Sequence, residues 1–228
     1  MKITTTQIEC MYEAADSLSR MALEEIEDLY GAGGRFPQKY HNLEHTRDVI
    51  NATQAIGLFA LEKDKIQPID IPLLIVASAW HDRYYDPRNK GENEIKSAGL
   101  AVKEMQRYTC FEPEHYKAVT EIILATTVSS FFPRIVQNVD PTDYRTGIIA
   151  DADLSSFGMP FDGFKPRAFA YLGELVETNQ QRLMQYLDGE CVLLTNHRWH
   201  TPEASELFPH AMDNVVAIRG LQSVYAIQ

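Results

Sequence analysis

The chain has 228 residues, and 45% of them are hydrophobic, which is enough for one sizeable core. Lysine and arginine number 21 and aspartate and glutamate 32, so the net charge of −11 disfavours a protein that binds a nucleic-acid polymer. The three cysteines form no C-x-x-C pair and predict neither a disulfide framework nor a thiolate zinc site. The polar amino terminus lacks the apolar stretch of a signal peptide, and no segment approaches the roughly 20 apolar residues of a membrane span. We therefore expect a cytoplasmic protein that does not act at a membrane.

Apolar residues recur mostly three and four positions apart, which is the period of an α-helix, while the alternation typical of strands is scarce. The pattern predicts an all-α chain that forms a single helical domain over residues 1–228, without repeats or linkers. We expect helices at about 6–30, 43–61, 69–82, 92–108, 113–127 and 143–157, with an irregular segment at 129–143 and two or three further helices between 163 and 228.

The third predicted helix carries the first chemical signal. In its sequence, "IDIPLLIVASAWHD", Asp70 is the expected cap and the residues that follow are apolar on nearly every face, so we expect the helix at the centre of the molecule. His81 and Asp82 end this helix at the rim of the core. A buried ionisable group without a partner costs several kcal/mol, so the pair either caps the helix or binds a ligand.

Two other predicted helices supply further candidate ligands. His45, in "YHNLEHTRDVI", faces the apolar side of its helix, where a histidine is either a packed core residue or a ligand. "IIADADLSSFG" contains two aspartates: Asp153 has apolar neighbours four residues away on both sides, whereas Asp151 better suits a solvated helix face.

The combined set therefore offers two imidazoles and two carboxylates from three helices. Such donors without a thiolate suit one divalent ion, namely Mn²⁺, Mg²⁺, Fe²⁺, Co²⁺ or Zn²⁺. An ion of this kind lowers the pKa of its bound water and polarises a phosphoryl oxygen. The set therefore predicts hydrolysis of a phosphate ester.

The order of a histidine, an HD dipeptide and an aspartate on successive helices resembles the HD superfamily of metal-dependent phosphohydrolases. "YHNLEHT", "AWHDRYYDP" followed by "NEIKSA", and "DADLSSFG" are similar to the motifs of one bacterial branch of predicted HD phosphohydrolases. The resemblance implies an HD-type helical bundle with its core at about 40–158 and additional amino- and carboxyl-terminal helices packed on it. The metal ligands that it implies are His45, His81, Asp82 and Asp153, with Asp151 as the alternative to Asp153.

The resemblance also implies residues around the metal. Glu94 and the ligand Asp82 form the expected catalytic group, with Glu94 acting as general acid or base or orienting the water. Glu94 equally fits a first-turn acid favoured by the helix dipole. His41, Tyr85 and Ser97 are the expected substrate-binding residues, although packed loop positions, or a plain helix-surface serine, would explain them as well.

The expected substrate is a nucleotide or another small phosphomonoester. HD enzymes with two metals usually add histidines between the HD pair and the last aspartate, and His115 is the only histidine in that interval, so we expect one ion. The alternatives are a regulatory protein that binds a metal and a nucleotide with little turnover, and an HD-type iron oxygenase with two metals. His197 and His200 are expected in surface or packing roles, with Trp199 anchoring its segment to the core. A homodimer is left open.

Overall fold

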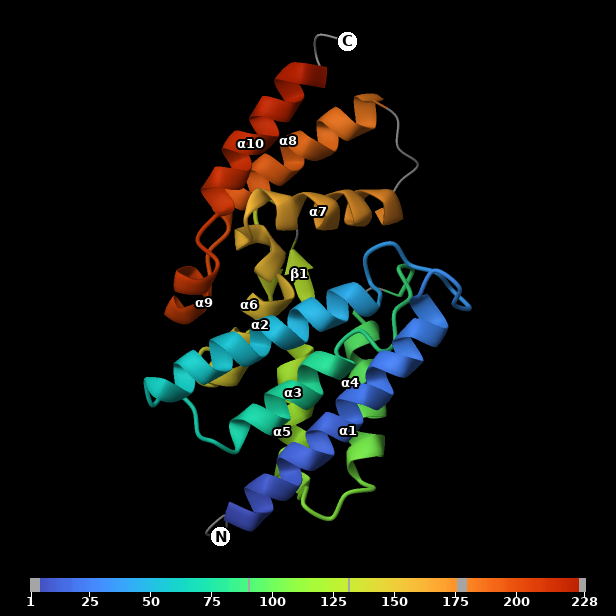
Figure 1. Cartoon of the computed structure of the whole chain (residues 1–228), viewed down its shortest axis with the longest axis vertical. Helices are drawn as coiled ribbons and strands as arrows, with labels where there is room; N and C mark the ends of the chain where they lie inside the picture. Colours follow the sequence, from blue (N-terminus) through green and yellow to red (C-terminus); the bar gives the residue numbers. More distant parts are fainter. Residues whose placement is uncertain (1–4, 90, 131, 176–179, 226–228) are drawn as a thin grey trace.

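We describe a computed structural model of the chain, and the description covers residues 5–89, 91–130, 132–175 and 180–225. Within these residues the structure has ten α-helices, one 3₁₀ helix and two short strands, which confirms the all-α prediction (Figure 1). The elements are α1 (Thr5–Tyr30), α2 (Leu43–Glu62), α3 (Asp70–Trp80), α4 (Asn93–Met105), α5 (Pro113–Leu124), β1 (Val128–Ser130), β2 (Val136–Gln137), α6 (Tyr144–Asp153), η1 (Ser155–Gly158), α7 (Phe161–Leu175), α8 (Gln180–Asn196), α9 (Pro202–Leu207) and α10 (Ala211–Tyr225). No helix of the described part is both long enough and apolar enough to cross a membrane.

Helix α3 lies at the centre of the larger core, as its sequence predicts. It packs against α1, α2, α4, α5 and α6, and most of its side chains are buried. Its last residue, Trp80, is 1% exposed and donates a hydrogen bond from its ring nitrogen to the carbonyl oxygen of Leu18 at 3.1 Å. Helix α3 therefore holds the residues that follow it, His81 and Asp82, against a rigid frame.

Three details differ from the sequence expectations. The residue at the cap of α3 is Ile69, while Asp70 accepts hydrogen bonds from the backbone of Gln67 and from Arg145 instead of capping the helix. The segment expected to be irregular contains the antiparallel pair β1 and β2. The helix expected at 143–157 stops at Asp153 and continues as η1, which ends at Gly158, where a Cβ atom would lie 2.0 Å from the carbonyl oxygen of Phe208.

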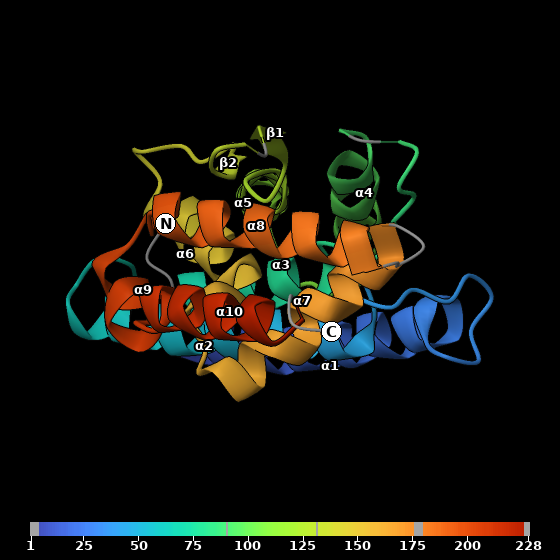
Figure 2. The same cartoon turned by 90° about the horizontal axis from the view of Figure 1, so that it is seen from above.

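The carboxyl-terminal third forms four helices where two or three were expected. Helices α7, α8 and α10 share a second, smaller apolar cluster and gather at the end of the molecule opposite the amino terminus (Figure 1). Figure 2, which looks down from that end, shows α8 and α10 side by side. Helix α9 instead packs on α2 and α6, and Trp199 before it contacts the larger core, which confirms the expected anchor.

Candidate metal centre

Four polar side chains from three helices meet at one point of the larger core. His45 comes from the first turn of α2, His81 and Asp82 follow α3, and Asp153 ends α6. The Nε2 atoms of the two histidines are 3.4 Å apart. Asp82 Oδ2 lies 3.1 Å from His81 Nε2 and 3.4 Å from His45 Nε2, while Asp153 Oδ1 lies 3.7 Å and 3.3 Å from the same two atoms. The residues that the sequence singled out as ligands therefore lie together.

These distances match those between ligands of one small divalent cation. Ligand atoms about 2.0–2.2 Å from an ion, at tetrahedral or octahedral angles, are about 2.8–3.6 Å from one another. The pairs above span 3.1–3.7 Å, and the donor atoms of His45, His81 and Asp153 all lie within 4.8 Å of one another. These three donors thus fit a bound metal without a large rearrangement, and Asp82 lies within 3.4 Å of both histidines.

The electrostatics of the cluster favour a cation. Burial alone lowers the pKa of His45 and His81, yet the charges and hydrogen bonds of Asp82 and Asp153 outweigh it and raise both pKa values. Burial likewise works against ionised carboxyl groups, but the two imidazoles hold the pKa of Asp82 well below, and that of Asp153 below, the usual range. Two carboxylates therefore stay charged in the core, where a divalent ion could take the place of the imidazole protons.

Hydrogen bonds to groups outside the cluster orient two of its four side chains. His81 Nδ1 lies 2.8 Å from the carbonyl oxygen of Ser78, so it donates its hydrogen there and leaves the Nε2 lone pair directed at the cluster. Gln137, in β2, donates from its amide to Asp153 Oδ2 at 3.3 Å and to the carbonyl oxygen of Ala150 at 3.1 Å. Sequence reasoning missed Gln137, because it lies in the segment expected to be irregular.

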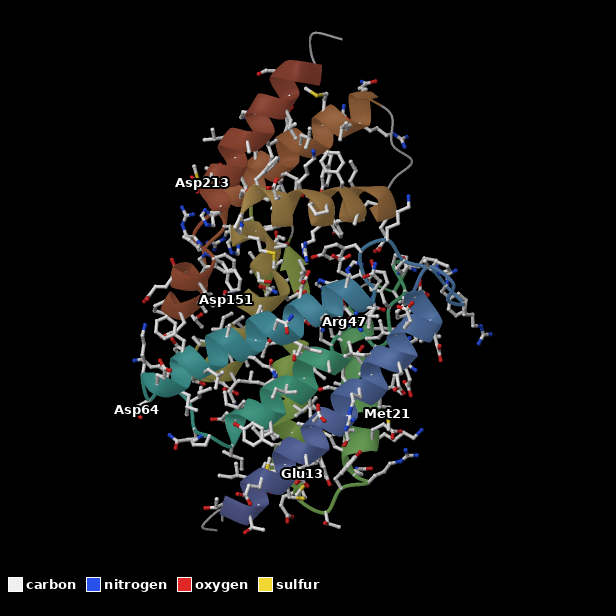
Figure 3. All side chains as sticks on the ribbon, in the orientation of Figure 1. Glu13, Met21, Arg47, Asp64, Asp151 and Asp213 are labelled. Carbon is white, nitrogen blue, oxygen red and sulfur yellow. The ribbon has the colours of Figure 1, made fainter. Side chains whose placement is uncertain are left out.

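Asp151 is buried away from this cluster. It is 0% exposed, so its assignment to a solvated helix face was wrong. Its carboxylate accepts hydrogen bonds from the backbone nitrogens of His200 and Thr201, both at 2.8 Å, and from the Thr201 hydroxyl at 2.7 Å (Figure 3 labels Asp151). These hydrogen bonds join the start of α9 to α6. Asp151 is therefore a buried clamp, that is, a residue that links two segments distant in the sequence.

A histidine and a glutamate face each other beside the metal cluster. His41 Nδ1 is bonded to Glu174 Oε1 from α7, and Glu174 Oε2 accepts from the backbone nitrogens of Tyr40 at 2.9 Å and His41 at 3.1 Å. Despite burial, these contacts lower the pKa of Glu174. The His41 ring stacks on Tyr85 with the centroids 3.8 Å apart and lies 5.8 Å from the His45 ring. Nothing near Glu174 in the sequence signals this role, since the pair is separated by 133 residues.

The residues of "NEIKSA" take separate places at the start of α4. Glu94 has a buried Oε2 without a hydrogen-bond partner among the described residues, and burial, followed by the charges of Asp82 and Asp153, raises its pKa. Ser97 is buried, and its hydroxyl bonds to the backbone nitrogen and carbonyl oxygen of Tyr84, at 3.0 and 3.3 Å. Its expected contact with substrate stays a prediction.

Two further polar residues have structural contacts. The Asn93 side chain accepts a hydrogen bond from the backbone nitrogen of Asp86 and donates one to its carbonyl oxygen, both at 3.2 Å, while Glu92 occupies the cap of α4. His115, the histidine between the HD pair and the last aspartate, accepts from the backbone of Glu112 at the start of α5. His115 is thus used in a helix cap.

Comparisons with known proteins identify the architecture. No protein-family model and no curated protein matches the chain. Among solved structures, it is similar to the phosphodiesterase domain of the Salpingoeca rosetta rhodopsin phosphodiesterase, with a TM-score of 0.68 and 14% identity over 92% of this chain and 82% of that one. The chain has the fold of a phosphodiesterase catalytic domain. It is also similar to LmjPDEB1 in complex with IBMX, with a TM-score of 0.57 and 14% identity over 95% of this chain and 84% of that one. The expected HD-type fold is therefore confirmed, while the assignment of individual motif residues stays a prediction.

Proposed function

We propose that the protein is a metal-dependent phosphohydrolase that cleaves a nucleotide or another small phosphomonoester with a metal-activated water. The observation that carries this proposal is that Asp82 and Asp153 each place a carboxylate oxygen 3.1–3.7 Å from the Nε2 atoms of both His45 and His81. The phosphodiesterase fold supports the same reaction class. The four side chains would hold one divalent ion, Mn²⁺, Mg²⁺, Fe²⁺, Co²⁺ or Zn²⁺. When bound, such an ion supplies an acidified water and polarises the phosphoryl oxygen.

In this proposal, His41 and Glu174 handle the leaving group. Glu174 accepts from His41 Nδ1 and thereby fixes the imidazole tautomer and orientation. A protonated His41 can donate a proton to the oxygen that leaves phosphorus, and the ionised Glu174 stabilises that charge. The Tyr85 ring, stacked on His41, holds the imidazole in place and lies half-buried beside Glu174.

Glu94 is the second acid–base group of the proposal. Its raised pKa and its unpartnered oxygen follow from the same partly buried position near Asp82 and Asp153. A carboxylate of raised basicity accepts a proton from an attacking water more readily than a solvated one. Glu94 would therefore orient and deprotonate the water, while His41 protonates the leaving oxygen, which departs as the product alcohol.

The first test is metal analysis of the purified protein beside two matched variants. We expect about one ion per chain in the wild type and in Asp151→Asn, and little in Asp153→Asn, because Asp153 faces the histidines and Asp151 does not. The same proteins, stripped with a chelator and reloaded with Mn²⁺, Mg²⁺ or Co²⁺, are then assayed on p-nitrophenyl phosphate and a panel of nucleotides.

Each outcome separates the proposal from its alternatives. Turnover that requires the ion and is lost in Asp153→Asn supports the hydrolase. Tight binding of one nucleotide without turnover would select a regulatory protein, and two ions per chain with oxygen consumption would select an iron oxygenase. Failure to bind any of these ions would refute the metal site. The cytoplasmic location and the homodimer stay predictions.

A further inference from the structure

A cavity of about 110 Å³ adjoins the metal centre and extends into the carboxyl-terminal helices. Asp153 and His41 border it together with residues of η1, α7 and α8. Much of its wall is aromatic and comes from Tyr40, Phe157, Phe164, Tyr171 and Tyr186. The roles proposed for Asp153 as a metal ligand and for His41 as a proton donor do not explain why much of the remaining wall is aromatic.

The cavity wall contains a carboxyl group without a full set of partners. Glu190, in α8, is 4% exposed, and its Oε2 has no hydrogen-bond partner among the described residues. Its neighbour Tyr186 has a single hydroxyl proton, and that hydroxyl also lies 2.9 Å from the carbonyl oxygen of Ala168. Burial, opposed only in part by Tyr186, raises the pKa of Glu190 to about 7. Burial therefore favours the protonated carboxyl in the empty cavity, and a cation bound beside it would favour the carboxylate instead.

Two side chains that line the cavity can carry positive charge, and both are already engaged, His41 by Glu174 and Arg167 by other groups. Arg167 donates to Asp48 and, at 2.9 Å, to the carbonyl oxygen of Gly163, and it lies 3.6 Å from Glu44. Its charge is therefore balanced outside the cavity. The uncompensated group is Glu190, and it calls for a partner that carries positive charge and hydrogen-bond donors.

We infer that this cavity binds the primary ammonium group of a small aminoalkyl phosphoester, with Glu190 as the residue that selects it. An ammonium group pairs with the Glu190 side chain that lines the cavity and gains cation–π attraction from the surrounding rings. A cavity of about 110 Å³ has room for a short aminoalkyl chain beside the metal centre.

The inference rests on the proposed function, because the phosphoryl group is placed at the metal beside Asp153. Hydrolysis of such a substrate breaks the bond between phosphorus and the ester oxygen. Water supplies the oxygen that joins phosphorus, and His41 supplies the proton that the leaving oxygen takes up. The products are an amino alcohol and inorganic phosphate.

The test measures binding separately from turnover. Phosphonates serve as probes, because a phosphoester hydrolase does not cleave their carbon–phosphorus bond. Calorimetric titration of the manganese-loaded protein compares 2-aminoethylphosphonate with propylphosphonate, in which a methyl group replaces the ammonium, and then the pair one carbon longer. We expect the amino compound of at least one pair to bind about tenfold tighter or more, as for a hydrogen bond to a charged group.

Variants assign the preference to the cavity. Glu190→Gln should reduce the ratio of the two affinities towards one, since the amide is nearly isosteric but uncharged. The control Glu13→Gln should keep the wild-type ratio, because Glu13 is exposed on α1, at the opposite end of the molecule from α8 (Figure 3). Circular dichroism establishes that both variants are folded.

The outcomes distinguish this inference from the proposed function. Three results would overturn the inference, even if the protein hydrolyses other phosphate esters. They are equal affinities within both pairs, no binding of any phosphonate, and an affinity ratio that Glu190→Gln leaves unchanged. A preference for the amino compounds that depends on Glu190 would support it. In that case, absence of turnover on O-phosphorylethanolamine would count against the hydrolase alone.

Discussion

The free energy of unfolding should depend on pH through Glu190. Burial raises the pKa of this carboxyl from its usual 4.5 to about 7 in the folded chain. The folded state therefore holds the proton more tightly than the unfolded state. The stability that this proton contributes is fully present below the unfolded pKa and is lost as the pH rises through the folded pKa. Each pKa unit corresponds to about 1.4 kcal/mol, so the loss between about pH 5 and pH 8 amounts to about 2–3 kcal/mol.

Urea unfolding of the wild type and Glu190→Gln isolates this contribution. Glutamine resembles the protonated carboxyl but does not titrate, so the difference in unfolding free energy between the two proteins removes the pH dependence of the other groups. We expect this difference to fall by about 2–3 kcal/mol from about pH 5 to pH 8. Tyr171 and Tyr186 face the same cavity, and the pKa of each is raised further above this window, so neither titrates within it.

A difference that stays constant over this pH range would refute the reasoning. It would mean that Glu190 ionises as easily in the folded chain as in the unfolded one, and hence that its oxygens are hydrated or paired. The cavity would then lack the unsatisfied carboxylate on which the ammonium inference depends. Glu13→Gln, on the exposed face of α1, serves as the control whose difference from wild type should not change with pH.

Four further changes test other parts of the site. His81→Ala should lower the metal content while circular dichroism still reports a helical protein, because the imidazole contacts the ligand cluster and one backbone carbonyl; equal loss of fold and metal would contradict its role as a ligand. Asp151→Ala should leave two backbone donors unpaired and lower the unfolding free energy by about 2–6 kcal/mol in urea titrations, while the metal is retained. Loss of metal without loss of stability would instead identify Asp151 as a metal ligand. Glu174→Gln should slow hydrolysis of alkyl phosphates about 10- to 100-fold but slow that of p-nitrophenyl phosphate less, because a good leaving group needs little protonation by His41. Equal effects on both substrates would argue against proton donation by His41. If Glu94 is the base, kcat/KM should rise with pH through a pKa above the usual range for glutamate, and Glu94→Gln should abolish that limb of the profile, whereas an unchanged profile would assign the limb to another group.

The sequence alone predicted the helical architecture and the central position of α3. Both depend on local information, because the spacing of apolar residues determines which face of a helix is buried. A helix that is apolar on every face, as residues 71–80 are, has to lie inside. The same reasoning directed His45 and Asp153 inward and placed His81 and Asp82 at the rim of the core, so the convergence of these four side chains follows from patterns within three short segments.

Tertiary structure alone decided the surroundings of that cluster. Glu174 reaches His41 across 133 residues, and Asp151 is a buried clamp because Thr201 and its neighbour lie against it. Glu190 belongs to a polar stretch of α8 and becomes an unpaired buried carboxyl only when α7 and η1 close around it. Hydrogen bonds and cavities between distant segments have no local period or composition, because they arise from how helices pack. For this protein, the sequence therefore indicated where a metal would bind, while packing determined what surrounds it.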